Sequence, residues 1–315
     1  MAENIATSEK INDAASRVMS KKNMAEVNTV DKVFRILGKI GVYTFLVVMA
    51  IVVLFPFYFM IISSLKDIDV FNTEVTPTLF PENPDWINYI EVFIKPDLDL
   101  NLGRLFLNTL YVGIVSTLLS LVITVLSAFA FARLEFKGRN ALFGAMLATM
   151  MIPGELFTIT NYVTTMQYFK WGNSYTILIV PFLVSVFYIY LLKQNFMQIP
   201  NELYLAAKVD GTTDIKYLWK VMIPLALPSL ISITILKMMG AWNSYMWPNL
   251  VNKDKAYHLI TNGLRGASFT PSGSMYPDTP LQMAAVTLVS IPLFLVFVFL
   301  RKYIMKGVSR SGIKG

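Results

Sequence analysis

The chain has 315 residues, of which 55% are hydrophobic and 15% are charged, and its formal net charge is +7. Because a soluble domain usually carries about 25% charged residues, this composition indicates a membrane protein. The chain has no cysteine and only one histidine, which excludes disulfides and thiolate metal sites and disfavours a histidine-built metal or acid–base site. The phosphate-loop pattern G-x-x-x-x-G-K-[ST] is absent, so we expect any ATP to bind another chain.

The N-terminal segment, 1–39, is polar and mixed in charge. It lacks the apolar core of a cleavable signal peptide, and the first long apolar run begins only near Ile40. We therefore expect this segment to precede the first membrane span.

Six apolar runs are each close to the ~20 residues that a membrane-spanning helix needs. They are Ile40–Ser64, Leu105–Ala132, Ala141–Tyr168, Thr176–Leu192, Val221–Trp242 and Leu281–Leu300. The predicted fold class is therefore an all-α membrane protein with six transmembrane helices in a domain spanning 40–300. Pro153-Gly154 interrupts the third run and predicts a kink or two half-helices there.

Two longer connections, 65–104 and 249–280, follow the first and fifth runs. The first holds eight Asp and Glu against three Lys and Arg, together with four prolines, and is expected to form a compact loop. The second holds His258, which has no partner visible in the sequence and for which surface contact is the default expectation.

The connection 196–220 is a polar, helix-forming island between two apolar runs. Pro200 and Glu202 are typical of a helix start, and Gly211 after Asp210 is typical of a helix end or a positive φ. Ala206-Ala207 would present a small, smooth surface to another protein. An ordinary cytoplasmic connection with an interfacial helix explains the same residues equally well.

Lys237 is a charge inside the fifth run, where a charged side chain costs at least ~2.5 kcal/mol and usually faces the bundle interior. Helical spacing places the small polar residues Ser229, Thr234, Gly240 and Ser244 on its face. Lys237 either contributes to a passage or ion pair, or reaches outward to the membrane surface. Its candidate partner is Glu155, next to the Pro153-Gly154 break. The candidate translocation path comprises Lys237, Asn243, Ser244 and Glu155.

The basic residues predict the orientation. Nineteen of the 27 Lys and Arg lie in the N-terminal segment, the second-to-third and fourth-to-fifth connections and the tail 301–315. Only seven lie in the alternate connections. We therefore expect both termini and the 196–220 loop to be cytoplasmic, and 65–104 and 249–280 to be external. The net charge follows from this topology and needs no nucleic-acid partner.

Residues 205–224 resemble the cytoplasmic "EAA" loop of binding-protein-dependent ABC importer permeases. The pattern E-A-A, three residues, G, then I-x-L-P falls on Leu205-Ala206-Ala207, Gly211 and Ile223-Pro224, with Asp210 as these permeases often have it. Two departures are that Leu205 replaces the family's Glu and that Pro224 follows Ile223 directly. Glu202, three residues away, is a candidate substitute for that Glu.

Two further segments carry the resemblance, which extends over about residues 40–315. Residues 240–248, GAWNSYMWP, are similar to the G-x-W-N-x-[FY]-x-W-P segment of sugar permeases. The tail 301–315, RKYIMKGVSRSGIKG, is similar to the ending of the second permease subunit in the maltose-type importers.

The resemblance implies the type I permease architecture of ABC importers in a bacterial plasma membrane. Such a permease pairs with a homologous second permease above a dimer of ABC ATPases, which bind ATP and Mg²⁺, so this chain needs no cofactor. An extracellular solute-binding protein delivers sugar, and the 249–280 loop of relatives probes that protein. The ATPase-coupling residues implied are Glu202, Leu205, Ala206, Ala207, Asp210 and Gly211.

The sequence thus predicts a permease subunit for sugars, with oligosaccharides favoured, and not an enzyme. An acidic sugar or glycerol phosphate as cargo for the same architecture stays open as an alternative. A self-contained membrane channel or enzyme is less favoured, because the spans hold no His/Asp/Ser constellation.

Overall fold

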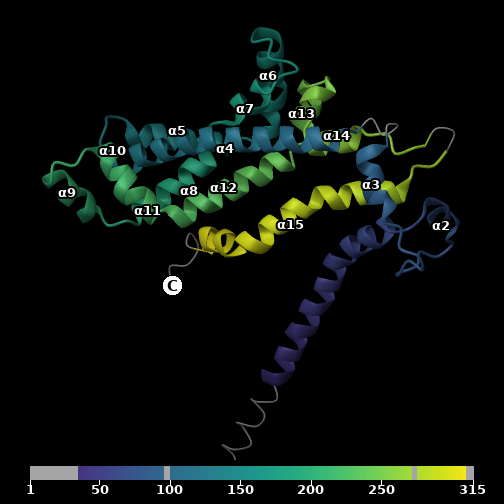
Figure 1. Cartoon of the computed structure of the whole chain (residues 1–315). Coiled ribbons are helices and arrows are strands. Elements are labelled where there is room, and N and C mark those ends of the chain that lie inside the picture. Colours follow the sequence, from purple (N-terminus) through teal and green to yellow (C-terminus); the bar gives the residue numbers. More distant parts are fainter. Residues whose placement is uncertain (1–34, 96–99, 272–274, 310–315) are drawn as a thin grey trace, which may run out of the picture. The chain divides into compact units, whose positions relative to one another are not determined.

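The computed structural model describes residues 35–95, 100–271 and 275–309, and every regular element among them is helical (Figure 1). Four helices are long and apolar enough to cross a membrane, and two bent helix pairs bring the number to six if each pair is one span. The predicted all-α membrane fold is therefore confirmed. The chain divides into two compact units, residues 1–62 and 63–315.

The first unit contributes most of the helix Arg35–Ser64. Between Ile36 and Phe57 its large apolar side chains are exposed around the whole helix. A helix that is apolar on all sides is suited to lipid rather than to water.

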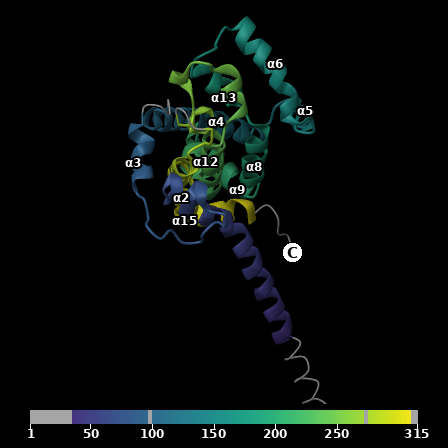
Figure 2. The ribbon, with the colours of Figure 1, turned by 90° about the vertical axis from the view of Figure 1, so that its right-hand side faces the viewer.

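The second unit is built around α4 (Leu102–Arg133), which packs against α8 (Val186–Met197) and α12 (Leu227–Trp242); α12 in turn packs against α15 (Thr279–Ser309) (Figure 2). The asparagine before α4, Asn101, caps the helix by accepting from the Arg104 backbone N–H at 3.0 Å. Buried small residues, Ser116, Ser120 and Thr124 among them, line its contact face. Small residues let membrane helices approach closely, so they favour this packing.

The third and fourth spans are both broken. The helix α5 (Arg139–Thr149) meets the segment Gly154–Tyr168 at 81°, which confirms the predicted break at Pro153-Gly154. That segment contains η2 (Gly154–Leu156), α6 (Phe157–Val163) and η3 (Thr164–Tyr168). A second break, which the sequence did not predict, bends α7 (Thr176–Ile179) and η4 (Val180–Phe182) by 46° from α8.

The fifth span begins earlier than predicted, because one helical stretch runs from Asp214 to Trp242. It consists of α10 (Asp214–Tyr217), η5 (Leu218–Met222), α11 (Ile223–Leu225) and α12. A proline removes one backbone donor and crowds the preceding turn. The π-type turn η5 ends at Met222, two residues before Pro224, where such a widened turn relieves that crowding.

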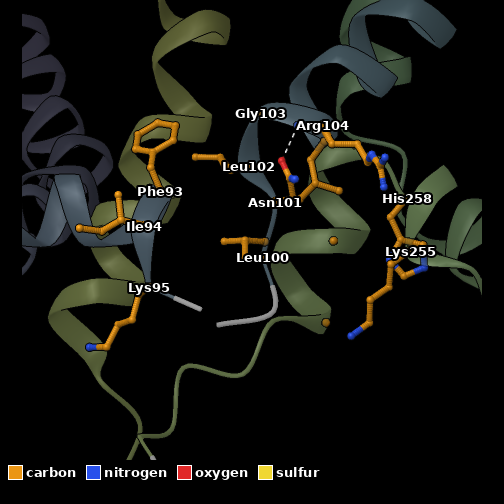
Figure 3. Close-up of a pocket in the computed structure, with 13 residues that line it drawn as sticks. Phe93, Ile94, Lys95, Leu100, Asn101, Leu102, Gly103, Arg104, Lys255 and His258 are labelled. Atoms are coloured by element: carbon orange, nitrogen blue, oxygen red, sulfur yellow. Dashed lines mark hydrogen bonds between the residues drawn. The ribbon is translucent and has the colours of Figure 1, made fainter. Parts of the chain in front are cut away.

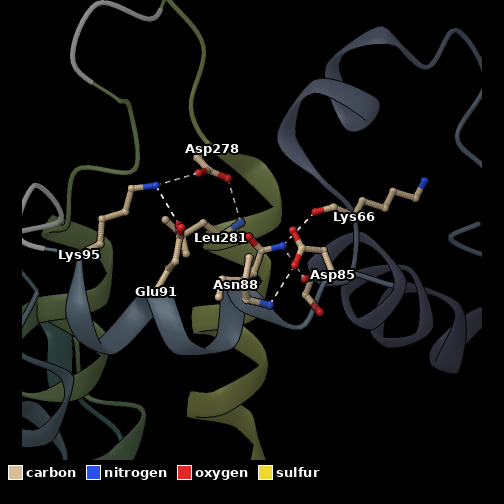
Figure 4. A network of polar contacts seen from close by, with 9 residues as sticks. Lys66, Asp85, Asn88, Glu91, Lys95, Asp278 and Leu281 are labelled. Carbon is tan, nitrogen blue, oxygen red and sulfur yellow. Dashed lines mark hydrogen bonds and ion pairs between the residues drawn. The ribbon is translucent and has the colours of Figure 1, made fainter. Parts of the chain in front are cut away.

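The segment after the first helix is held together by polar contacts (Figure 4). The buried Lys66 ammonium donates to Glu74 Oε2 at 2.6 Å, near α2 (Ile68–Thr73), and this hydrogen bond lowers the pKa of Glu74. The amide of Asn88, in α3 (Ile87–Ile94), donates to the carbonyls of Ser64 and Lys66. These contacts are consistent with the predicted compact loop.

A three-residue ion-pair cluster then joins α3 to the start of α15 (Figure 4). Lys95 Nζ lies 3.0 Å from Glu91 and 3.5 Å from Asp278, whose carboxylate also accepts from the Leu281 N–H. Burial lowers the pKa of Lys95, but the two carboxylates outweigh it and raise that pKa above its usual value. The outer connection before α15 contains α13 (Met246–Val251), η6 (Lys255–Tyr257) and α14 (Ile260–Gly266).

Candidate functional site

The island forms a helical hairpin, residues 201–217, made of α9 (Asn201–Val209) and α10. Pro200 occupies the position before α9, Glu202 lies in its first turn and Lys208 in its last, as the helix dipole favours. Gly211 has a φ of +68°, and the Gly211 N–H donates to the Lys208 carbonyl at 3.0 Å. The Thr212 N–H donates to the Ala207 carbonyl at 2.8 Å. This pair of bonds is the Schellman helix end, which needs the left-handed residue that glycine supplies.

Asp214 closes the hairpin from the α10 side. Its Oδ1 accepts from the Tyr204 hydroxyl and from Lys208 Nζ, each at 2.7 Å. The hydrogen bond between them raises the pKa of Lys208 and lowers the pKa of Asp214, so it favours the charged form of both. The rings of Tyr204 and Tyr217 lie 5.1 Å apart, which adds a packed contact between the two helices. The hairpin is therefore fixed by its own side chains, and sequence reasoning missed Tyr204 and Asp214.

Arg133, the last residue of α4, joins the hairpin to the bundle. Its Nη2 donates to the Phe196 carbonyl at 2.9 Å and to the Ile199 carbonyl at 2.5 Å, and Nη1 lies 3.5 Å from Asn201 Oδ1. The guanidinium is buried and donates to one carbonyl of α8 and to one in the connection that follows it. The Phe196 carbonyl also accepts from the Ile199 N–H at 3.2 Å. Sequence analysis counted Arg133 only as a topology signal.

The free side of the hairpin is apolar. Leu205 and Val209, four residues apart on one face of α9, are 56% and 88% exposed. Ile215 and Trp219 are exposed on the segment that follows. The predicted coupling residues fit this picture in one respect: all are exposed except Ala207, which packs partly against the buried cluster around Tyr217. A contiguous exposed apolar surface marks a binding site for protein or lipid.

Lys237 and Ser244, from the predicted translocation path, both line a cavity of about 370 Å³. The Lys237 ammonium donates to the Phe182 carbonyl at 2.5 Å, at the break in the fourth span. The other predicted members lie elsewhere. Asn243 is exposed and donates to the Met239 carbonyl at 2.9 Å, and Glu155 is exposed in η2. Within the described part of the chain, Lys237 forms no ion pair with Glu155.

A second cavity, of about 570 Å³, lies between α3, the start of α4, η6 and α14 (Figure 3). Arg104, Lys255 and His258 are among its lining residues.

His258 is half-buried and has a partner within the chain that the sequence did not indicate. Its Nε2 lies 3.2 Å from the Asn252 carbonyl, and burial lowers its pKa. The segment holding it is fixed to α4, because the Asn108 amide donates to the carbonyls of Ala256 and His258 at 2.8 and 2.9 Å. Thr109 Oγ1 also accepts from the Ile260 N–H at 2.8 Å.

The sequence and the fold of this chain are similar to those of known membrane transport proteins. A sequence model of the family described as "Binding-protein-dependent transport system inner membrane component" matches residues 120–310, more than half of the chain. The arabinooligosaccharides transport system permease protein of Halalkalibacterium halodurans is 28% identical over 267 residues, which cover 84% of this chain and 93% of that protein.

Two more proteins are similar along most of the chain. The polygalacturonan/rhamnogalacturonan transport system permease protein of Bacillus subtilis is 27% identical over 288 residues, covering 87% of this chain and 97% of its own length. A crystal structure of a bacterial ABC transporter involved in the import of the acidic polysaccharide alginate contains a chain with a TM-score of 0.74 and 22% identity. The match covers 85% of this chain and 96% of that one. This last likeness establishes the fold.

Proposed function

This chain belongs to the family of binding-protein-dependent transport system inner membrane components, and on that premise we propose that it is one permease subunit of an ATP-driven importer for sugars, with oligosaccharides as the favoured cargo. It is a multi-pass membrane protein and a transport permease, not an enzyme. The observation that carries the proposal is the hairpin 201–217, which is rigid within itself and apolar on its free face.

The hairpin is the docking element for an ATPase subunit. Leu205 and Val209 insert into a groove of that subunit, because a helix binds a groove through apolar residues four apart. The ATPase dimer holds the ATP and Mg²⁺, and its closure moves the hairpin as one piece. Arg133 passes this motion to α4 through the carbonyls of Phe196 and Ile199. The motion then becomes a rigid-body change of access across the membrane.

The remaining partners and the topology complete the proposal. A homologous second permease forms the passage together with this chain, and an extracellular solute-binding protein delivers the cargo. Both termini, 1–39 and 301–315, and the 196–220 loop face the cytoplasm of a bacterial cell, and loops 65–104 and 249–280 face outward. Glu202 and Asp210 are exposed beside the docking face and contribute its polar contacts, and the small Ala206 side chain lets the partner approach closely.

The docking surface is tested by replacing Leu205 and Val209 together with Gln, which preserves helix formation but removes the apolar face. Each apolar side chain buried in an interface contributes about 1.5–3 kcal/mol, so we expect the ATPase to bind at least about tenfold more weakly. The measurement is retention of the ATPase when the detergent-solubilised complex is purified through this chain.

The matched control is Val75→Gln, since Val75 is 97% exposed on a loop far from the hairpin in sequence. It should leave ATPase retention unchanged. Full retention by the Leu205→Gln/Val209→Gln variant would show that the hairpin is not the docking element.

A further inference from the structure

Among the described residues that line the 370 Å³ cavity, Lys237 is the one with a charged side chain. The walls of this cavity come from α4, η4, α8, α12 and the segment around α13, and they combine hydroxyls with aromatic rings. Ser116, Ser185 and Ser244 are among the polar members, and Tyr188 and Trp247 among the aromatic ones. Hydroxyl donors and flat apolar rings together suit a sugar, because binding cavities are mainly apolar with a few placed polar groups. No Asp or Glu is among the described residues that line it.

Lys237 is held there by a backbone dipole rather than by a carboxylate. The Phe182 carbonyl lies at the end of η4, where the break before α8 removes the helix that would have paired with it. One N–H of the ammonium is used in this bond, and an ammonium carries three donors. Among the described residues no ion pair involves Lys237.

A charged amine within a span is costly, and such residues usually pair or contact a substrate. Trp247, another lining residue, already has a partner, because its indole N–H donates to the Ile177 carbonyl at 2.9 Å. Lys237 is therefore the group in this cavity whose charge lacks a counterpart within the described chain.

From this we propose that the imported cargo carries an oxyanion, a carboxylate or a phosphate, and that Lys237 contacts it during passage. The inference rests on the proposed function and names its cargo class: an acidic oligosaccharide or a sugar-like phosphate rather than a neutral sugar. Lys237 selects by charge, because a hydrogen bond between ionised groups is stronger than a neutral one. The Phe182 carbonyl orients the ammonium while the remaining N–H groups bind the cargo.

The test uses the complete importer in proteoliposomes with its own binding protein and ATPases. Uptake is measured for three probes: trigalacturonate, glycerol 3-phosphate and neutral arabinotriose. The wild-type complex should import at least one anionic probe in preference to arabinotriose. Lys237→Gln keeps a donor for the Phe182 carbonyl but removes the charge, and should lower uptake of that anion about tenfold or more. Lys237→Arg should retain most of it.

Lys253→Met and Lys237→Met form a matched pair of charge removals. Lys253 also donates to a backbone carbonyl, that of Asn249 at 3.0 Å, but it is exposed and does not line the cavity. Uptake should fall in Lys237→Met and not in Lys253→Met. Recovery of the partner permease and ATPases with each variant reports assembly; if Lys237→Met fails to assemble, Lys237→Gln decides.

Three results would overturn the inference while leaving the importer function intact. One is import of arabinotriose alone, and another is equal anion uptake by wild type and Lys237→Gln. The third is an equal loss of neutral and anionic uptake in Lys237→Gln, which would assign the ammonium to a carboxylate of the second permease. By contrast, a complex whose ATP hydrolysis no loaded binding protein stimulates would refute the importer function itself.

Discussion

Replacing Gly211 by valine should uncouple ATP hydrolysis from the binding protein while leaving the chain in the membrane. Gly211 sits at a φ of +68°, and a Cβ added there would meet no atom within 4 Å. The penalty is therefore confined to the backbone: a left-handed conformation costs an L-residue about 1–2 kcal/mol, with a β-branched residue at the upper end. That energy corresponds to roughly a 5- to 30-fold loss of the closed helix end.

The assay is binding-protein-stimulated ATP hydrolysis by the reconstituted complex, with the amount of chain in the membrane measured in parallel. Stimulated activity should fall in the order Gly, Asn, Ala, Val at position 211, because Asn tolerates the left-handed region best among the substitutes. Gly138→Val is the matched control, since Gly138 has a φ of +82° and equally open surroundings in another loop. Normal stimulation in Gly211→Val, or an equal loss in Gly138→Val, would refute this reasoning.

Two further predictions concern transmission and topology. Arg133→Met removes the side-chain donor to the carbonyls of Phe196 and Ile199. The Phe196 carbonyl keeps its bond from the Ile199 N–H, so the cost of an unsatisfied group, about 1–3 kcal/mol, applies to the Ile199 carbonyl. ATPase retention should therefore persist while stimulated hydrolysis falls severalfold. Arg139→Met, which removes one local bond to the Leu134 carbonyl, should change little, and an equal effect of both would remove Arg133 from the transmission path. To test the topology, single cysteines are introduced into this cysteine-free chain and labelled with an impermeant reagent. Cysteines at positions 85 and 265 should react from outside, and those at positions 25, 137, 210 and 312 only from inside. Labelling of position 210 from outside would contradict both the orientation and the docking role.

The spans and the island were predictable because they depend on local composition. Long apolar runs mark the spans, and Pro153-Gly154 marked a break that the structure places there. The second break was not predicted, because Leu183-Val184-Ser185 contains no glycine or proline to interrupt a helix. Pro181 lies inside η4 rather than at the bend. The start of the fifth span at Asp214 was not predicted either, since its first turns are polar and were assigned to the helix-forming island rather than to a span.

The details of the site depended on contacts between distant residues. Gly211 was predictable, because a glycine after a helix has a local cause. Arg133 lies more than 60 residues from the carbonyls that it binds, and nothing in its neighbours indicates that contact. The candidate Lys237–Glu155 pair was matched only by sign, and among the described residues the structure instead gives Lys237 a backbone carbonyl at a break that the sequence did not predict.

The helical stretch Asp214–Trp242, which includes the π-type turn η5 and a turn at Ala226, connects the hairpin to the cavity, and under the proposed function the two are ends of one lever. From Asp214 to Lys237 the helical rise amounts to about 35 Å. Over that length a tilt of about 10° displaces the far end by about 6 Å, comparable to the width of one sugar ring. The widened turn η5 and Pro224 lie close to the hairpin, so the stretch bends most easily at the end that the ATPase would move. The part that contains Lys237 is regular α-helix. The Lys237 ammonium would then move with α12, and its distance from the Phe182 carbonyl would change as the permease changes its access across the membrane.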